Sequence, residues 1–469
     1  MKRFGSLAAL LAVVLVAGAC GRSSSGPSAT PTSGGETTTA PGGGAQGPGD
    51  FGTLKDVCGP GNNTQSPAQG VTPDAIDIAT SADPGYSGRP GLDQEIFDAG
   101  DVFADWCNAA GGINGRKIVL HKYDAAVLDF DAQVKKACAT DFFLVGNGNV
   151  LDDTGQKSRL SCVLPEIPTY MVSIQGRDSD LTVQPVPNRS TQYAVSPFNY
   201  VAQKFPDATK SVVTMTGNIS ATLLVDAQAT EAAKDLGWTV KADIKYNPLG
   251  ETTWLPFAQQ IKDKGAKGLI YTGEPQNYAL LAKALQQINY KLDFTIVAAN
   301  HYDQNMIKDG GSAIQNVYMV VGFVPYEDAS KNPPTQQYLD LFDKYKPNGK
   351  SHAALGLQTW SAWLLFAKAA KACGDNLTRR CVYDNALKET DWTGGGLNAP
   401  QDVKDQKASE CGIVLEASAD GFAEPDGWEP NNGFFNCDPK NVLTLNDDYS
   451  KYGTGAKLSD VGKSMSDLK

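Results

Sequence analysis

The sequence is poor in histidine and lacks the short motifs that mark several common enzyme active sites. Only three histidines occur among 469 residues, and the patterns HExxH, GxSxG and GxxxxGKS/T are absent. His121 falls in an expected strand and His352 at an expected helix start, which favours structural roles, whereas His301 follows a strand and could line a cleft. Adjacent acids such as Asp152 and Asp153 point apart on a helix or a strand. The sequence therefore predicts no enzyme, no metal site and no cofactor.

Long runs of one charge and long apolar runs are also missing. The net charge is -11, without the clustered basic residues that a nucleic-acid partner would need. The apolar run at 7–17 is shorter than the roughly 20 residues of a membrane-spanning helix. No cysteines are spaced as Cys-x-x-Cys, so neither a zinc site nor a thioredoxin-type redox pair is expected.

The first residues have the pattern of an export signal. A basic start, the apolar run and the small residues Ala17-Gly18-Ala19 predict a signal peptide over residues 1–19. Cys20 follows directly and resembles the lipidated cysteine in the lipobox of bacterial lipoproteins, although Ala17 stands where leucine is usual. A secreted protein with a free cysteine and an uncleaved anchor are the alternatives. We expect a lipid on Cys20 and a location in the bacterial cell envelope, outside the cytoplasm and attached to the membrane.

The segment after Cys20 has no aromatic residue and almost no apolar bulk as far as about residue 50. Such a Gly/Ser/Thr/Pro-rich chain cannot bury enough surface to offset the entropy lost on ordering. Gly and Ser make it flexible, and Pro extends it. We expect residues 20–57 to form a disordered tether that holds a folded body away from a membrane.

Eight cysteines remain for the body of the protein. An even number in an exported chain predicts disulfides, and eight cysteines can pair in about a hundred ways. Pairing between neighbours in the sequence is our prediction. The expected pairs are Cys58–Cys107, Cys138–Cys162, Cys373–Cys381 and Cys411–Cys437.

The body alternates short apolar strands with amphipathic helices. Strands are expected at 75–80, 117–123, 142–146 and 163–172, and then at 211–216, 239–246, 268–272 and 294–298. Helices are expected between them, at 93–110, 130–140, 221–236, 254–264 and 277–288. This alternation is typical of parallel sheets covered by helices on both faces. The fold class is therefore α/β, in two doubly wound halves.

The order changes after a further strand at 317–322. Long helices are expected at 335–345 and 353–372, followed by a looser Gly/Asp/Asn-rich tail. The late helices either return to the first half, so that the chain crossings form a hinge, or belong to two independent domains in series. The pattern leaves both arrangements open. The tail at 426–469 is expected to be a loose cover, fastened by the Cys411–Cys437 pair.

One turn resembles a known family. Residues 108–118 read NAAGGINGRKI, in which a helix ends at a Gly pair, a turn forms around Asn114-Gly115 and a strand begins. This turn is similar to that of the leucine/isoleucine/valine-binding family of type 1 periplasmic binding proteins, which deliver ligands to ABC importers. The segments at 70–78, 123–124 and 142–146 agree with the family pattern. The resemblance covers most of the chain from 71 to about 417.

The resemblance implies two Rossmann-like lobes, a multi-strand hinge and a cleft that closes on a small molecule. Lobe 1 would comprise 71–195 plus 323–398, and lobe 2 would comprise 196–322 plus 399–425. Ligands of open α/β sheets lie outside the carboxyl ends of the strands, so the expected contacts follow strands. They are Asp83, Tyr86, Asn147, Asn149, Ser173 and Gln175 in lobe 1, and Asn218, Glu274, Asn300 and Tyr302 in lobe 2.

Two departures from the family pattern bear on the ligand. Amino-acid receptors of the family hold the α-carboxylate with Ser/Thr-rich loops, whereas the loop at 146–153 reads GNGNVLDD. The acidic residue that usually meets the α-ammonium falls at or near Asn300, and a neutral amide cannot supply a charge-assisted bond. The sequence is thus compatible with an amino-acid-like ligand and equally with a neutral polar, amide-like or aromatic one.

The resulting expectation is a monomeric, lipid-anchored binding protein that closes on a small molecule and docks on the permease subunits of an ABC importer. A tethered sensor that feeds a signalling receptor and an adhesive surface lipoprotein are the alternatives. A hydrolytic surface enzyme is less favoured, because it would need two carboxylates facing across a substrate.

Overall fold

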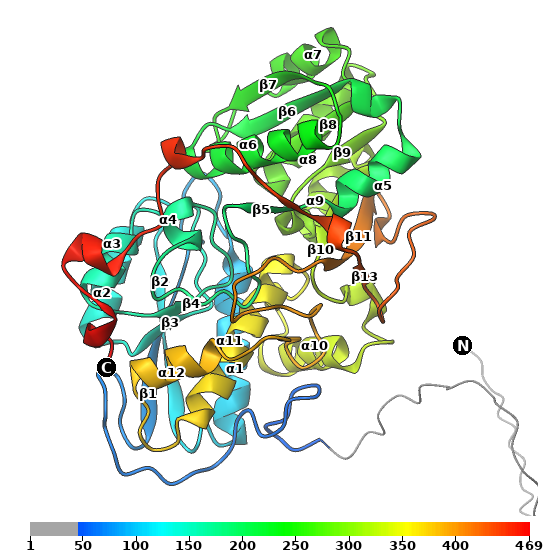
Figure 1. Cartoon of the computed structure of the whole chain (residues 1–469). Coiled ribbons are helices and arrows are strands. Elements are labelled where there is room, and N and C mark those ends of the chain that lie inside the picture. The colour runs from blue at the N-terminus through cyan, green and yellow to red at the C-terminus, as the bar shows by residue number, and fades with distance from the viewer. Residues whose placement is uncertain (1–45) are drawn as a thin grey trace, which may run out of the picture. The chain divides into compact units, whose positions relative to one another are not determined.

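A computed structural model describes residues 46–469, which form one compact unit. The expected signal peptide, Cys20 and the tether up to residue 45 lie outside the described residues. The unit consists of two α/β lobes, each built around its own sheet (Figure 1). No helix within residues 46–469 combines the length and the apolar character that crossing a membrane requires.

Lobe 1 contains a parallel four-stranded sheet in the order β2-β1-β3-β4. The strands are β1 (Ala75–Ala82), β2 (Lys117–Asp124), β3 (Phe143–Val145) and β4 (Glu166–Ile167). The helices are α1 (Gln94–Ala110), α2 (Phe130–Thr140), α3 (Gln156–Ser161), α4 (Ile174–Arg177), α10 (Pro333–Tyr345), α11 (Ala354–Ala372) and α12 (Arg379–Ala386). Since successive side chains alternate between the faces of a sheet, Phe143 and Val145 pack in the core with α1 and α11, and Leu144 packs against α2.

Lobe 2 contains five parallel strands, β6 to β10, extended at one edge by the antiparallel strands β11 and β12. The strands are β6 (Val212–Gly217), β7 (Val240–Tyr246), β8 (Gly268–Thr272), β9 (Phe294–Ile296), β10 (Val317–Val321), β11 (Cys411–Ser418), β12 (Gly421–Ala423) and β13 (Asn436–Cys437), which pairs with β11. The helices are α5 (Ser196–Lys204), α6 (Ser220–Asp235), α7 (Leu255–Asp263), α8 (Pro275–Gln287) and α9 (Gln304–Gly310). Leu269 and Tyr271 of β8 face α7 and α8, whereas Ile270 faces α5 and α6.

The late helices return to lobe 1, so the arrangement of two domains in series is excluded. The chain passes from β4 to β6 by way of β5 (Gln192–Ala194), returns after β10 to α10, α11 and α12, and crosses again before β11. Helix α11 packs directly on α1. The lobes are therefore joined by several chain crossings, as a hinge requires.

The folded body begins earlier than the sequence suggested. Phe51 is fully buried, and its ring lies 5.4 Å from that of Trp360 on α11. Val57 is buried as well. The expectation that the disordered tether extends to residue 57 is wrong for residues 46–57, because these two side chains supply apolar surface that the aromatic core of lobe 1 covers.

Four disulfides join cysteines that are neighbours in the sequence, as expected. They are Cys58–Cys107, Cys138–Cys162, Cys373–Cys381 and Cys411–Cys437. The first ties the N-terminal segment to α1, and the last ties the beginning of the tail to β11. Each of these crosslinks restricts the unfolded chain and so favours the folded state.

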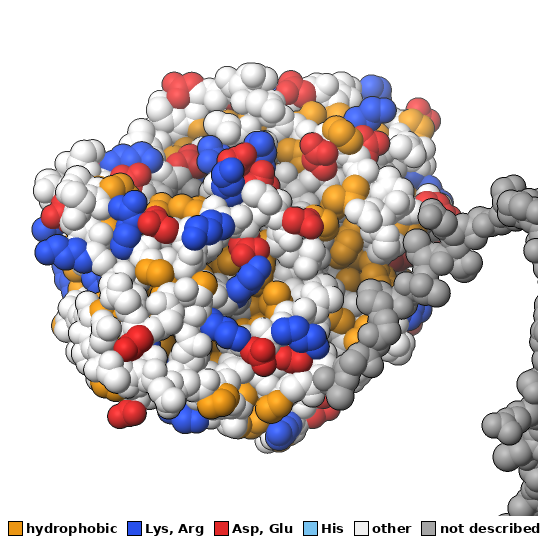
Figure 2. Space-filling model, turned by 60° about the horizontal axis from the view of Figure 1, so that its bottom comes forward, with side chains coloured by type: hydrophobic (Ala, Val, Ile, Leu, Met, Phe, Trp, Pro, Cys, Tyr) orange, Lys and Arg blue, Asp and Glu red, His pale blue; other side chains and the backbone are white. Residues whose placement is uncertain are grey.

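Charge is mixed on the surface of the body. Figure 2 shows Lys and Arg side chains interspersed with Asp and Glu side chains over one face, with small apolar areas between them. Large apolar side chains that are exposed occur singly, for example Leu128 and Leu280. Scattered residues of this kind are normal on a soluble domain surface and mark no docking patch.

The C-terminal tail differs most from its expected form. Residues 442–469, here called the C-terminal strap, contact both lobes and are not a loose cover. Strand β14 (Val442–Thr444) pairs with β5, and the tail then reaches α6 of lobe 2. There Glu231 accepts hydrogen bonds from the backbone N–H groups of Asn446 and Asp447 and from the hydroxyl of Tyr449.

The end of the C-terminal strap packs on lobe 1. Leu458 and Leu468 are buried in one apolar cluster with Leu160 of α3 and Leu181. In Figure 1 the red end of the chain runs from α6 past α4 to α3. The strap was not recognised in the sequence because its apolar residues are widely spaced and follow no helical or strand period.

Replacing Glu231 with alanine should loosen the C-terminal strap, because three donors lose a charged acceptor. We expect a loss of about 1.5–3 kcal/mol in the local stability of the strap. Hydrogen exchange measured by mass spectrometry should become faster in residues 445–458 and stay unchanged in β1. Asp235→Ala, an exposed position on the same helix, is the matched control. Unchanged exchange of the strap in the Glu231→Ala variant would contradict this role.

Candidate ligand-binding site

A cavity of about 370 Å³ lies between the lobes at the carboxyl ends of their strands. Its wall includes residues that follow β3 and β4 in lobe 1 and residues that end or follow β8, β9 and β10 in lobe 2. Because parallel strands end at the same edge of a sheet, each lobe presents its loops to the cleft. The volume falls within the range of roughly 300–1,000 Å³ that is usual for small-molecule sites.

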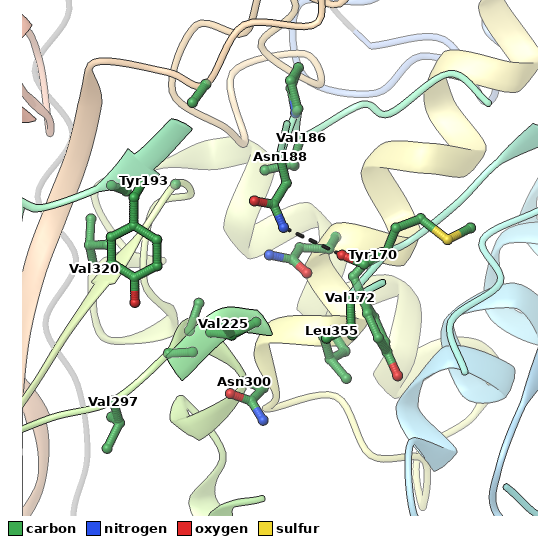
Figure 3. A pocket seen from close by; sticks show the side chains of 18 of the residues that line it. Tyr170, Val172, Val186, Asn188, Tyr193, Val225, Val297, Asn300, Val320 and Leu355 are labelled. Carbon is green, nitrogen blue, oxygen red and sulfur yellow. Dashed lines mark hydrogen bonds between the residues drawn. The ribbon is translucent and has the colours of Figure 1, made fainter. Parts of the chain in front are cut away.

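Most of the cavity wall is apolar. Figure 3 shows side chains of both lobes around the space, with a group of aliphatic residues and two tyrosines among them. The labelled apolar and aromatic residues are Tyr170, Val172, Val186, Tyr193, Val225, Val297, Val320 and Leu355. Burying an apolar ligand against such a wall is favourable by about 25 cal/mol per Å² of surface removed from water.

An ion pair bridges the two lobes at the cavity. Glu274, the residue before α8 in lobe 2, accepts a hydrogen bond from Nη1 of Arg89 in lobe 1 at 3.0 Å. Both side chains are partly buried, and Glu274 lines the cavity. The carboxylate therefore already has a cationic partner in the structure.

A second carboxyl group in the wall, that of Asp93, has a raised pKa. Asp93 accepts a hydrogen bond from the hydroxyl of Tyr170 at 3.2 Å. Burial, together with the negative charge of Glu274, raises the pKa of Asp93 well above its usual range. Burial likewise raises the pKa of Tyr170. Burial therefore favours the protonated forms of both side chains in this part of the site.

Arg177 ends the short helix α4 and contributes a positive charge to the cavity wall. Its Nε donates to the carbonyl of Met171 at 3.3 Å, and its Nη1 donates to Oε1 of Gln228 in α6 at 3.0 Å. Burial lowers the pKa of Arg177, and the nearby carboxylate of Asp152 opposes that effect. The guanidinium therefore links the lobes through a neutral amide.

Asp152 holds the loop before α4 in place through hydrogen bonds to its backbone. Its carboxylate accepts hydrogen bonds from the backbone N–H groups of Val172 and Ser173. Burial raises the pKa of Asp152 to about 6. Ser173 in turn caps α4, because its hydroxyl accepts from the N–H of Gly176 at 3.0 Å. These bonds place Val172 in the cavity wall.

Two of the ten residues expected to contact a ligand line the cavity, namely Glu274 and Asn300. The Nδ2 group of Asn300 donates to the carbonyl of Gly273 at 3.0 Å, so its orientation is fixed. The other eight lie elsewhere. They are Asp83, Tyr86, Asn147, Asn149, Ser173, Gln175, Asn218 and Tyr302.

Several of these eight side chains are engaged within the protein. Asp83 is fully buried and accepts hydrogen bonds from the N–H groups of Val127 and Val150 and from Nδ2 of Asn149. Asn147 donates to Glu166. These residues position the loops that reach the cavity, since Val150 itself lines the wall.

The remaining residues face other parts of the molecule. Tyr302 is buried and its hydroxyl donates to Glu327. The carbonyl of Gln175 accepts from the N–H of Ala456 in the C-terminal strap, and Asn218 is exposed. The hydroxyl of Tyr86 lies 3.5 Å from the carbonyl of Leu249 in lobe 2.

Reasoning from the sequence missed two kinds of lining residue. Tyr170 and Val172 lie in the loop after β4, which ends at Ile167, whereas the sequence pattern placed them inside an expected strand at 163–172. Residues 184–198 line the cavity as they cross from lobe 1 to lobe 2. This crossing has no periodic pattern, so position after a strand was the one signal that could have found part of the set.

His301 does not contribute to the cavity wall. It is fully buried, and burial lowers its pKa to about 3, so the imidazole is neutral. Within residues 46–469 no group of His, Cys, Asp and Glu side chains is arranged to hold a metal ion. The cavity wall is thus largely apolar, with the ionisable side chains of Asp93, Arg177 and Glu274 in it.

Solved structures resemble the whole body of the protein. A fatty acid ABC transporter substrate-binding protein from Thermomonospora curvata is 14% identical, with a TM-score of 0.64, and the match covers 81% of this chain and 97% of that one. The branched-chain amino acid transporter substrate binding protein LivJ from Streptococcus pneumoniae, in complex with isoleucine, is 15% identical, with a TM-score of 0.61, and the match covers 75% of this chain and 100% of that one. At these identities the likeness shows the fold, which is that of type 1 periplasmic binding proteins.

Sequence comparison identifies the family. No curated protein matches the chain. A family model described as periplasmic binding protein matches residues 93–422, which is more than half of the sequence and spans both lobes. The neighbours and the family are named as binding proteins, not as enzymes, and the resemblance inferred from the turn at 108–118 is confirmed. The chain belongs to the periplasmic binding protein family.

Proposed function

We propose that this protein is the solute-binding subunit of an ABC importer, held outside the cytoplasm by a lipid on Cys20. The observation that carries the proposal is the cavity between the lobes, whose wall comes from strand ends of both lobes. A ligand that contacts both lobes favours their closed arrangement, which a permease can distinguish from the open one. The solutes named for the two similar structures, isoleucine and a fatty acid, support a small organic solute as the ligand.

Ion pairs across the cleft support closure as the response to ligand. Arg89 of lobe 1 pairs with Glu274 of lobe 2. Lys350 lies between Glu95 of α1 and Asp303 of lobe 2, at 2.9 Å from each carboxylate. These pairs hold the lobes together at two places, and at least the first would separate if the cleft opened.

A ligand of the cleft should both stabilise and compact the protein. At 100 times its dissociation constant a ligand stabilises the folded state by about 2.7 kcal/mol. A thermal-shift screen of organic solutes, followed by small-angle scattering of each hit, measures the two effects. Stabilising solutes should reduce the radius of gyration. If no solute of a broad metabolite library does so, the proposed function is wrong.

Arg89→Ala should shift the ligand-free protein toward the open arrangement. The Arg89–Glu274 pair is partly exposed, so its loss is worth at most about 1 kcal/mol, or roughly fivefold in the ratio of open to closed molecules. Energy transfer between dyes on the two lobes measures that ratio. Lys135→Ala, which removes an ion pair within α2, is the matched control and should have no effect. An equal change in both variants would argue that the Arg89–Glu274 pair does not hold the lobes together.

Cys20→Ser should release the protein from the membrane, because it removes the thiol that the lipid would occupy. Cell fractionation should find the variant in the soluble fraction. Its affinity for a ligand of the cleft should equal that of the wild type, since the anchor and the cleft are separate. A variant that stays with the membrane would show that the anchor is not this cysteine.

A further inference from the structure

Arg177 carries a charge in the cavity wall and forms no ion pair with any other residue of 46–469. Among the residues that the structure describes, the charged side chains of the wall are Asp93, Glu274 and Arg177. Glu274 is paired with Arg89, and Asp93 accepts a hydrogen bond from the hydroxyl of Tyr170, while burial raises the pKa of its carboxyl group. The hydrogen bonds of Arg177 within residues 46–469 go to neutral acceptors. The guanidinium of Arg177 is therefore a cation of the wall without an ion-pair partner among residues 46–469.

Burying this cation without an ion-pair partner costs free energy. The Arg177 residue is 7% exposed. The carboxylates of Asp152 and Asp178 favour its charged form, but neither makes an ion pair with it. Nη2 of Arg177 has no acceptor within residues 46–469. Buried charges are normally paired, and a guanidinium matches the two oxygens of a carboxylate with two parallel hydrogen bonds.

Tyr193 supplies a second donor on the same wall. It lies in β5, lines the cavity, and its ring is seen among the valines in Figure 3. Its hydroxyl makes no hydrogen bond with any described residue. Burial raises the pKa of Tyr193 and the charge of Arg177 acts against that rise, so the phenol stays protonated and lies within the electrostatic reach of the guanidinium.

We propose that the ligand is a monocarboxylate with an apolar alkyl or aromatic body, whose carboxylate pairs with Arg177 and whose body lies against the valine-rich wall. This inference rests on the proposed function, because it names the ligand of the same cleft. The apolar wall departs from the small polar ligand expected from the sequence. An α-amino acid fits less well, because Glu274, the carboxylate that would meet its ammonium group, is already paired with Arg89.

Calorimetric titration of the full chain carrying Cys20→Ser tests this assignment with defined probes. Octanoate and phenylacetate should bind, whereas octanamide, which has the same body as octanoate without the charge, should bind far more weakly. Arg177→Gln should weaken octanoate binding by about 10- to 100-fold, as expected for the loss of a charged hydrogen-bonded partner, and leave octanamide unchanged. Arg177→Lys should restore part of the affinity, because it keeps the charge but loses the planar fork.

Arg379→Gln is the matched control for the loss of a buried guanidinium. Arg379 bonds to backbone carbonyl groups of lobe 1, including that of Phe142, and does not line the cavity. The Arg379→Gln variant should have a lower melting temperature and unchanged octanoate binding. Tyr193→Phe, which removes only a hydroxyl, provides a mild variant and should weaken octanoate binding severalfold.

The outcomes separate the ligand class from the proposed function. Equal binding of octanoate by the wild type and Arg177→Gln would overturn the assignment, and so would tighter binding of leucine or of octanamide than of octanoate. If neither octanoate nor phenylacetate binds while another solute compacts the protein, the assigned ligand class is wrong and the proposed solute-binding function is retained. If no solute compacts the protein, the proposed function itself falls.

Discussion

Parallel strand pairing is the constraint on which the site depends. In each sheet the parallel strands end at one edge, and the loops that follow them must gather there. The chain crossings hold these two edges opposite each other, so that residues as distant as Val150 and Val320 share one wall. Closure of the cleft can then change the distance between two preformed half-sites without refolding either lobe.

The polar loop residues and the apolar wall have different tasks. Asp83 and Asp152 are buried carboxylates whose hydrogen bonds fix the loops after β3 and β4. The side chains that these loops then present to the cavity are largely apolar, Val150 and Val172 among them. In this protein, buried polar residues after the strands brace the loops, and apolar neighbours in the same loops form the cavity wall.

The C-terminal strap adds a connection between the lobes beyond the crossings of the hinge. It is bonded to Glu231 on lobe 2 and packed beside Leu160 on lobe 1. Opening the cleft must either stretch this segment or pivot about it. The strap, which follows both sheets in the sequence, therefore affects how far the lobes can move relative to each other.

The sequence by itself determined the α/β class, most strands and helices and the family, because these rest on local period and a short turn motif. Pairing of neighbouring cysteines was one choice among about a hundred, and the structure decided it. Helix α2 was predicted at its exact bounds and the five parallel strands of lobe 2 within two residues, whereas β11, β12 and β13 were not predicted. Only the tertiary structure decided which residues form the cavity, since Arg177 and Tyr193 come from a short helix and a crossing segment that carry no periodic signal. It also decided the charge of the site, because pairing of Glu274 and burial of Asp93 are properties of neighbours in space.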